Sequence, residues 1–490
     1  MRWLRQGSWP LYISILFGIV VTAWQWYAIN PDGIAYSDIA GKWAHGRFYE
    51  AINAYWSPFW SWLLVPFLWL GLTPLAAIRL LELLLLFFAL IDWKHWLQWL
   101  AGKQRPAWLP WLELAGGINL AYYAQAISGP DLLATLLVLH FVRLLISDRH
   151  TAYMGILLGI MFLTKVYLLY FGILASGLAL IYRIQQGTIW AAELRRVFSI
   201  LSISLLFIVP WIAALNYKYG NLSLGSSGKY NAQNRFAGGI EHPWKNGGLI
   251  PPPDEYSTFV WTDITTVYPT YQRLQQQKPA SVIPVLSYNV KKSVRLLMIN
   301  CAFTLFAFYF LVRHRKKKLH SFPRVLILTA LAGLYLAGYQ LFSAEHRYFW
   351  PVFMIGISLP VLWMDFLPKR VLFTGGLCLL LTIPHSLVRA FYPRNGLDDY
   401  KQAVALLDKI PPGSRIASWK TRETWFISFH NRYRDYGGLM GEAEVRQSLA
   451  ARQHQIQFVL FQSTDLASVK AAFPAQTIDS AGNWYYLTLK

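Results

Sequence analysis

The chain has 490 residues, of which 55% are hydrophobic and only 14% are charged, whereas soluble proteins average about 25% charged residues. This composition excludes an ordinary soluble protein and indicates a membrane protein. The net charge of +21 comes from short Lys and Arg clusters between apolar runs, a pattern typical of multi-pass membrane proteins and not of nucleic-acid-binding proteins. Both cysteines lie inside apolar runs, so no disulfide framework is predicted.

Apolar runs of membrane-spanning length recur along the chain and predict about eleven transmembrane helices. The first is interpreted as a retained signal-anchor helix, and a Trp- and Pro-rich run at 56–72 is too short and broken to count among them. The predicted spans are 10–29, 74–92, 110–127, 130–147, 152–165, 167–183, 197–215, 294–312, 323–342, 347–366 and 370–390.

The basic clusters orient these spans, because Lys and Arg are enriched in cytoplasmic loops. They fall on one side only if 56–72 lies in or re-enters the outer interface without crossing. The protein is then expected in the inner (plasma) membrane, with its N-terminus in the cytoplasm and its C-terminus outside. The alternative, a twelve-helix arrangement, would put the basic segment 94–105 outside. The clusters lie at 2–5, 93–105, 143–149, 183–196, 313–318 and 368–370.

Two domains are predicted, a transmembrane domain over 1–390 and an extracytoplasmic α/β domain over 391–490. The transmembrane domain carries two outer loops, 30–73 with interfacial helices and the polar loop 216–293. In the second domain the pattern indicates helices at 398–410 and 442–453 and strands at 415–419, 458–462 and 483–490.

Two carboxylates on the predicted outer side are candidate catalytic groups, because ionisable side chains close to the hydrocarbon are costly. Asp32 follows Pro31 directly after the first span and is either a capping or first-turn acid of a short helix or a general base. Asp131 heads a later span after Pro130, where capping is an equally good explanation. Asp38, Lys42 and Arg47 are predicted to form a solvated helix face.

Three further residues on the same side suit an anionic phosphate. Lys165 lies at a turn between two apolar helices, where it either snorkels to head groups or holds the anion. Arg347 and Tyr348 begin another span, as residues of an interfacial girdle or as phosphate ligands. The guanidinium fork matches the geometry of phosphate, which a girdle does not require.

The order of these motifs resembles the GT-C superfamily of membrane glycosyltransferases, which includes protein O-mannosyltransferases, lipid A aminoarabinose transferases and transferases of the dolichyl-phosphate-mannose type. PDGIAYSDIA, followed by YWSPFW, is similar to their first outer loop, with Asp32 and Tyr36 at the matching acid and tyrosine. GPDLLATLL, LTK and EHRYFWP resemble their later motifs and carry Asp131, Lys165, Arg347 and Tyr348. The resemblance covers roughly residues 10–390.

The resemblance implies transfer of a sugar from a polyprenyl-phosphate-linked donor to a hydroxyl of a glycan, lipid or protein on the outer face. It implies Asp32 as general base in an inverting displacement, Asp131 as the second carboxylate, and Tyr36, Lys165, Arg347 and Tyr348 at the donor phosphate. Position 33 is Gly, where many relatives have a second acid, so a mechanism that needs adjacent carboxylates is excluded.

Other interpretations remain open. A polymerase or ligase of lipid-linked oligosaccharides would share these motifs, and a transporter or flippase of lipid-linked sugars would also combine spans with charges. No cofactor is expected to be required and no metal site is predicted, although Asp32 and Asp131 could hold a divalent ion if their side chains meet.

Overall fold

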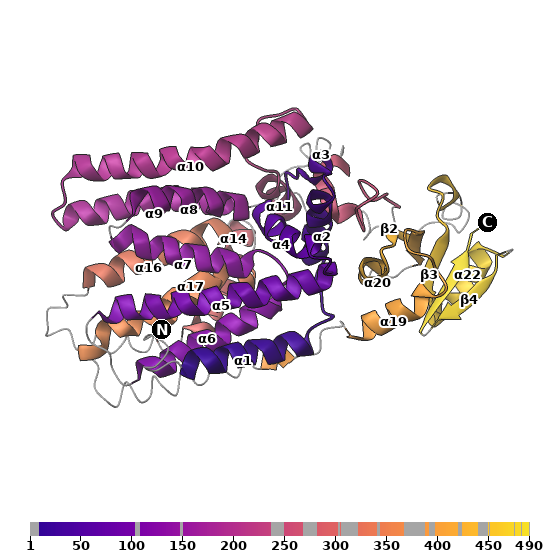
Figure 1. Cartoon of the computed structure of the whole chain (residues 1–490), viewed down its shortest axis with the longest axis horizontal. Coiled ribbons are helices and arrows are strands. Elements are labelled where there is room, and N and C mark those ends of the chain that lie inside the picture. Colours follow the sequence, from indigo (N-terminus) through magenta and orange to yellow (C-terminus); the bar gives the residue numbers. More distant parts are fainter. Residues whose placement is uncertain are drawn as a thin grey trace.

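A computed structural model of the chain describes residues 9–102, 108–147, 150–236, 249–267, 282–301, 304, 322–340, 344–366, 388–391, 397–419, 424–439, 449, 451–474, 476–481 and 483–489. It is mostly helical, with a small sheet near the C-terminus. In Figure 1 the long helices lie side by side, and the sheet lies beyond one end of them.

The helical part is a layered bundle in which many of the packed helix pairs are not consecutive along the chain. Contacts join α1 to α6, α5 to α6 and α7, α8 to α10, and α9 to α16. Its long elements are α1 (Trp9–Trp24), α5 (Pro74–Ala101), α6 (Leu109–Ala126), α7 (Asp131–Ser147), α8 (Thr151–Thr164), α9 (Val166–Gln185), α10 (Trp190–Tyr219), α14 (Val282–Asn300), α16 (Phe322–Gln340) and α17 (Trp350–Ser358), the last flanked by η4 (His346–Phe349) and η5 (Leu359–Phe366).

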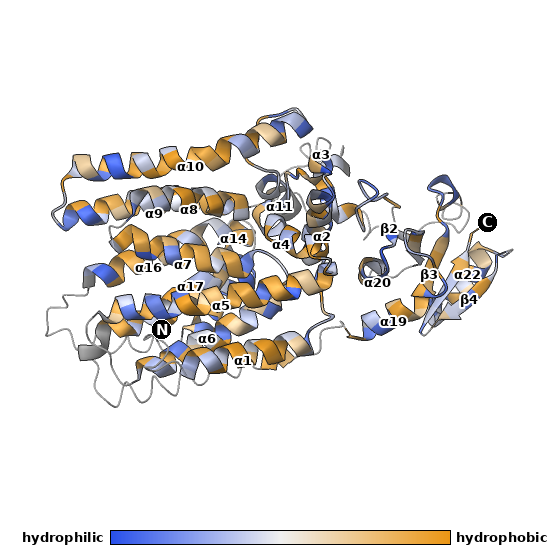
Figure 2. Cartoon of the chain, viewed as in Figure 1, coloured by the Kyte–Doolittle hydropathy of each residue, from blue (hydrophilic) through white to orange (hydrophobic). Residues whose placement is uncertain are grey.

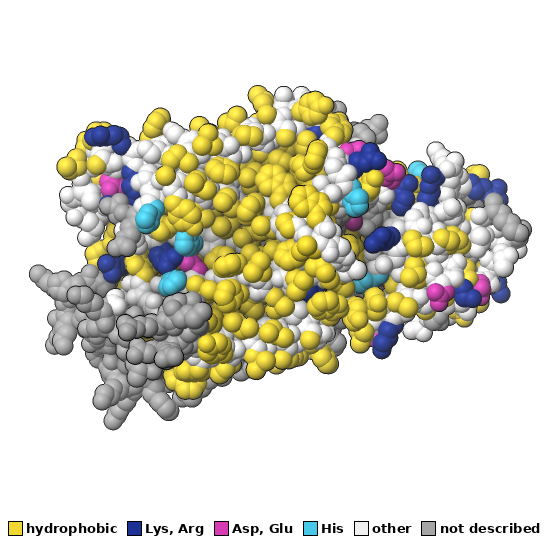
Figure 3. All heavy atoms as spheres, viewed as in Figure 1, with side chains coloured by type: hydrophobic (Ala, Val, Ile, Leu, Met, Phe, Trp, Pro, Cys, Tyr) yellow, Lys and Arg dark blue, Asp and Glu magenta, His cyan; other side chains and the backbone are white. Residues whose placement is uncertain are grey.

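The lateral surface of this bundle, around its circumference, is apolar. Figures 2 and 3 show hydrophobic residues over the middle of the helices, with charged side chains and histidines near both ends. Within the described residues, α5, α9 and α10 are long and apolar enough to cross a membrane, and α1, α4 (Phe59–Trp69) and α8 are shorter apolar helices. A chain of this kind is a membrane protein, as its composition predicts.

The predicted spans correspond to helices wherever the chain is described. Helix α4 has 11 residues, and the interpretation of 56–72 as a non-crossing segment stays a prediction. Helix α14 begins at Val282, inside the loop predicted to continue to residue 293. Most of the predicted span 370–390 lies outside the described residues, as does the greater part of the predicted helix 442–453.

Short helices lie across the end of the bundle that faces the sheet (Figure 1). Helix α2 (Pro31–Ala44) packs on α4 and buries Ile34, Tyr36 and Ile39. The remaining short helices of this end are α3 (Phe48–Ala51), α11 (Ser227–Phe236), η3 (Val260–Asp263) and α12 (Ile264–Val267). Since α2 lies across the spanning helices, it fits the predicted interfacial helix of the first outer loop.

Residues 249–267, which belong to the predicted second outer loop, are fixed on α2 by buried polar contacts. Lys42 is fully buried and its Nζ lies 2.5 Å from a carboxylate oxygen of Asp254. The Asp38 carboxylate accepts hydrogen bonds from the backbone N–H and the hydroxyl of Thr258, and burial raises its pKa to about 6. The prediction that Asp38 and Lys42 belong to a solvated face is therefore wrong, whereas Arg47 is exposed.

The same segment is tied to α10. Lys218 Nζ lies 2.8 Å from Asp263 Oδ2 and also donates to the backbone carbonyl of Ile52. The Trp56 indole N–H donates to the carbonyl of Trp261. The contacts to Asp263 and Trp261 hold residues 249–267 against the end of the bundle.

The C-terminal part is a mixed five-stranded sheet in the order β2-β1-β3-β5-β4. Strand β1 pairs in parallel with both β2 and β3, and β5 is antiparallel to β3 and β4. The predicted strands 415–419 and 458–462 match β1 and β3, and β5 falls within the predicted 483–490. The elements are α19 (Leu397–Leu407), β1 (Arg415–Trp419), α20 (Thr424–Asn431), β2 (Arg434–Leu439), β3 (Phe458–Gln462), η6 (Ser463–Asp465), α22 (Leu466–Ala472), β4 (Ile478–Ala481) and β5 (Trp484–Thr488).

The edge of this sheet is hydrogen-bonded to the outer loop. Phe259 forms a parallel bridge with Asp435 of β2, and the Asp435 N–H donates to the Thr258 carbonyl. The Ile250 N–H donates to the Tyr436 carbonyl at 2.9 Å. The loop thus continues the sheet beyond β2 and joins it to α2.

Replacing Lys42 by Met is expected to destabilise the protein by about 3 kcal/mol, because removal of one partner leaves the Asp254 carboxylate without its buried counter-ion. Thermal unfolding in detergent measures the change. Arg47→Gln is the matched control, since it removes the ion pair from the same helix end to Glu255, with both side chains exposed. Equal losses in the two variants would contradict the assignment.

Candidate active site

Four charged residues meet where α2, the α6–α7 turn, the α8–α9 break and η4 converge. Asp32 lies in the first turn of α2, and Asp131 is the first residue of α7. Lys165 separates α8 from α9 in an extended conformation with φ −154° and ψ 126°. Arg347 lies in η4, directly before α17.

Ion pairs connect the four side chains in one chain of contacts. Arg347 Nη1 lies 2.6 Å from Asp32 Oδ2 and 3.8 Å from Asp131 Oδ2. Lys165 Nζ lies 2.5 Å from the other oxygen of Asp131. Two carboxylates and two cations therefore alternate, and their formal charges sum to zero. Outside this alternation, Glu345, with a half-exposed side chain, pairs with Arg347 Nε at 2.7 Å.

The alternatives left by the sequence are narrowed by these contacts. Asn30, not Asp32, is the N-cap residue of α2, so Asp32 is the first-turn acid of that helix and not its cap. Lys165 contacts Asp131 and lies 5.1 Å from the centre of the Tyr348 ring, so its ammonium faces protein groups. Asp131 begins α7 as expected.

Aromatic rings enclose the charged residues. The Tyr348 ring stacks on Tyr339 of α16 and also lies 5.1 Å from the Arg347 guanidinium. Tyr36 is buried one turn after Asp32 and meets Trp56 edge to face. Burial, together with the charges of Asp32 and Asp131, raises the pKa of the Tyr36 phenol well above its usual value. Tyr36 is therefore a neutral hydroxyl.

Arg79 of α5 fixes the two turns that carry the carboxylates. Its side chain is 1% exposed and forms a 2.7 Å ion pair with Glu82. Towards α1 its guanidinium donates to the backbone carbonyls of Gln25, Trp26 and Ala28, and towards α6 it donates to the side chains of Gln125 and Ser128. Asp32 follows the first of these turns and Asp131 follows the second.

Sequence reasoning missed Arg79. The signal was an arginine and a glutamate three residues apart in the apolar run PLAAIRLLELLLL, and such intramembrane charges are functional candidates by default. The pair lies inside a predicted span, away from the predicted outer loops and helix ends that carry the other candidate residues.

Gly33 lies where α2 touches the turn before α7. A Cβ at this position would be 2.7 Å from Ser128 Cβ and 3.0 Å from the Ser128 carbonyl oxygen. Asn30 reinforces the contact, because its Oδ1 accepts a hydrogen bond from the Ser128 N–H. An acidic side chain at position 33 therefore has no room. The second carboxylate near Asp32 is instead Asp131, which follows the same packed turn.

No group of three or more His, Cys, Asp and Glu side chains suited to a metal ion occurs within the ranges that the structure describes. Asp32 and Asp131 do share a neighbour, since Arg347 Nη1 contacts both. Each carboxylate thus faces a cation of this chain.

The fold is similar to those of solved membrane glycosyltransferases. The crystal structure of ArnT from Cupriavidus metallidurans bound to undecaprenyl phosphate matches with a TM-score of 0.58 and 12% sequence identity, over 98% of this chain and 97% of that one. The cryo-EM structure of the arabinofuranosyltransferase AftD from Mycobacteria matches with a TM-score of 0.50 and 11% identity, over 99% of this chain and 40% of that one.

Both of these proteins are GT-C superfamily members, and this chain has the GT-C fold. The resemblance drawn from its sequence motifs is confirmed at the level of the fold. No family model and no curated protein matches the sequence.

Replacing Gly33 by Ala is expected to lower the thermal unfolding midpoint, because the added Cβ forces α2 away from Ser128. Gly41→Ala is the matched control in the same helix, since a Cβ there meets nothing within 4 Å and alanine favours the helix by about 0.5–1 kcal/mol. The packing argument fails if Gly33→Ala is as stable as Gly41→Ala.

Proposed function

We propose that the protein transfers a sugar from a polyprenyl-phosphate-linked donor to a hydroxyl acceptor on the outer face of the membrane. The observation that carries the proposal is the alternating chain of Asp32, Arg347, Asp131 and Lys165 at one end of the helices. The GT-C fold adds support at a coarser level, because a fold restricts the function without fixing it.

The donor phosphate is proposed to bind Lys165 and Arg347. In doing so it displaces the carboxylates of Asp32 and Asp131 from these two cations. Both cations are partly exposed, at 19% and 17% of their side-chain surface, so an anion can reach them. Arg347 offers a planar fork and Lys165 a point charge, and both stabilise negative charge as it develops on the leaving phosphate. Tyr348, beside both cations, and the neutral hydroxyl of Tyr36 help to orient the phosphate.

Asp32 is proposed as the general base and becomes available when the phosphate binds. In the structure Asp32 Oδ2 is paired with the Arg347 guanidinium, 2.6 Å from Nη1. Once the donor phosphate takes the guanidinium, Asp32 accepts the proton of the acceptor hydroxyl while that oxygen attacks the anomeric carbon. The bond from this carbon to the phosphate oxygen breaks, polyprenyl phosphate leaves, and the configuration inverts.

Asp131 is proposed to complete the charge balance as the second carboxylate, because it contacts both cations and is 5% exposed. No cofactor is required in this scheme: Lys165 and Arg347 supply the charge that a divalent ion would provide. If a metal ion did bind, Asp32 and Asp131 would be its ligands.

Of the competing functions, one predicts a different arrangement of charges and the other predicts the same arrangement. A transporter or flippase places coupling charges near the bilayer midplane, whereas these four residues lie at helix ends. A polymerase or ligase of lipid-linked oligosaccharides would use the same chemistry on a longer donor. The acceptor is a hydroxyl of a glycan, lipid or protein.

Asp32→Asn is expected to lower transfer at least about 100-fold without loss of folding, because it removes the general base. The assay is transfer from a polyprenyl-phosphate-linked sugar in proteoliposomes. Glu345→Gln is the control, since it also removes a carboxylate that pairs with Arg347 but lies outside the alternating chain. Near-parental transfer by Asp32→Asn would refute the assignment.

Lys165→Met is expected to weaken binding of a short-chain polyprenyl phosphate about tenfold, because it removes a charge-assisted hydrogen bond. Asp32→Asn should bind the same probe at least as tightly as the parent, since the phosphate then no longer competes with a carboxylate for Arg347. Isothermal titration of the purified proteins measures both. Equal weakening in the two variants would rule out the proposed exchange.

A further inference from the structure

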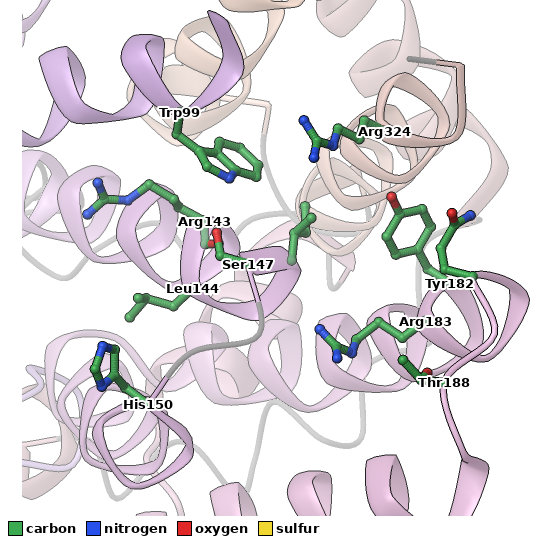
Figure 4. A pocket seen from close by; sticks show the side chains of 11 residues that line it. Trp99, Arg143, Leu144, Ser147, His150, Tyr182, Arg183, Thr188 and Arg324 are labelled. Carbon is green, nitrogen blue, oxygen red and sulfur yellow. The ribbon is translucent and has the colours of Figure 1, made fainter. Parts of the chain in front are cut away.

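A pocket of about 690 Å³ lies at the other end of the helices from the candidate active site (Figure 4). Its walls are the last turns of α5, α7 and α9, the turn after α9, the residue before α8 and the first turn of α16. The lining residues are Trp99, Arg143, Leu144, Ile146, Ser147, His150, Tyr182, Arg183, Gln186, Thr188 and Arg324.

Three helices connect this pocket with the active site. Helix α7 runs from Asp131 to the pocket over 17 residues, and α9 runs from the residue after Lys165 over 20 residues. At 1.5 Å per residue they measure about 25 and 30 Å, close to the roughly 30 Å hydrocarbon thickness of a bilayer. Helix α16 spans the same distance, with Arg324 near its start and Tyr339 near its end. The pocket therefore lies among the head groups of the opposite leaflet.

The pocket carries an excess of positive charge. Figure 4 shows the guanidinium groups of Arg183 and Arg324 directed into it, whereas that of Arg143 turns away. Arg143 pairs with Asp92 at 2.8 Å, and Arg183 shares Glu193 with Arg196. Arg324 is exposed and has no ion pair among the residues that the structure describes. Among the described residues in and next to the pocket, four arginines thus accompany two carboxylates, and the described lining residues include no acid.

The remaining lining matches a lipid better than a free anion. The Thr188 hydroxyl is buried without a hydrogen-bond partner in the described part of the chain. Trp99, Leu144 and Ile146 give the pocket an apolar wall. The neighbouring helix surfaces are apolar and exposed, at Ile181 and Ile184 of α9 and Leu326 of α16. An acyl chain leaving the pocket would therefore continue along hydrophobic helix surfaces.

From this charge, hydroxyl and apolar lining we infer that the pocket binds the phosphate head group of an anionic phospholipid in the leaflet opposite the active site. Arg324 and Arg183 bind the phosphate oxygens, and Thr188 donates its unpartnered hydroxyl. The glycerol part lies against Trp99 and Leu144, and the acyl chains extend along α9 and α16. This site is separate from the donor-phosphate residues by the length of α7.

The test is native mass spectrometry of the full-length protein from micelles containing phosphatidylglycerol and phosphatidylcholine. The parent is expected to retain phosphatidylglycerol preferentially, and Arg324→Gln to retain it about fivefold less. Thr188→Val, which keeps the shape of the side chain, is expected to reduce retention by a smaller factor. Arg195→Gln is the matched control, because Arg195 is an exposed arginine of α10 outside the pocket lining, and it should behave like the parent.

Three outcomes would overturn the inference. Equal loss in Arg324→Gln and Arg195→Gln would mean that the lipid adheres to a general basic surface. Equal retention of the two lipids by the parent would remove the anion preference. Displacement of phosphatidylglycerol by inorganic phosphate at equal concentration would mean that the apolar wall contributes nothing and that the ligand is a free anion. Thermal unfolding of each variant verifies that the fold is intact.

Discussion

The buried guanidinium of Arg79 is the constraint on which the end of the helices that carries the candidate active site depends. A charge inside a largely apolar bundle is tolerated only when its donors are satisfied, and here three backbone carbonyls, two polar side chains and Glu82 accept from it. The carbonyls belong to the α1–α2 turn, and Gln125 and Ser128 belong to the end of α6 and the turn before α7. Satisfying one charge therefore fixes the relative position of two chain segments that are far apart in sequence.

On this support, two carboxylates alternate with two cations, and the half-exposed Glu345 adds a third carboxylate beside Arg347. Ions that are paired in this way avoid the cost of an isolated ion in a poorly hydrated site, yet the two cations remain partly exposed. An arriving phosphate finds cations already in position and has only to displace carboxylates of the same charge. The carboxylates thus hold the two cations in the positions that a phosphate would need, which limits the reorganisation that binding requires.

The site residues that could be predicted from the sequence are those whose charge is unusual among apolar neighbours. Asp32, Asp131, Lys165 and Arg347 stood out because charges are rare in an apolar chain, and all four converge. Lys42 was misjudged because its partner Asp254 is 212 residues away in a loop without regular periodicity. The sheet was predicted through its apolar strands β1 and β3, whereas β2, with the sequence RDYGGL, and the four-residue β4 lack that signal. The sequence shows that Gly33 stands where many relatives have an acid. The reason for a glycine, its packing against Ser128, is visible only in the structure.

The hydrogen bonds between the outer loop and β2 have a consequence for the evolution of this chain. Residues 250–259 form backbone hydrogen bonds with the edge of the C-terminal sheet. Lys42 and Asp38 of α2 contact the same segment from the other side. The sheet is therefore not an interchangeable module. A chimera that exchanged only the last hundred or so residues would keep these hydrogen bonds only if the new sheet offered an edge strand with the same backbone position. Exchanging the loop together with the sheet would keep both halves of this junction.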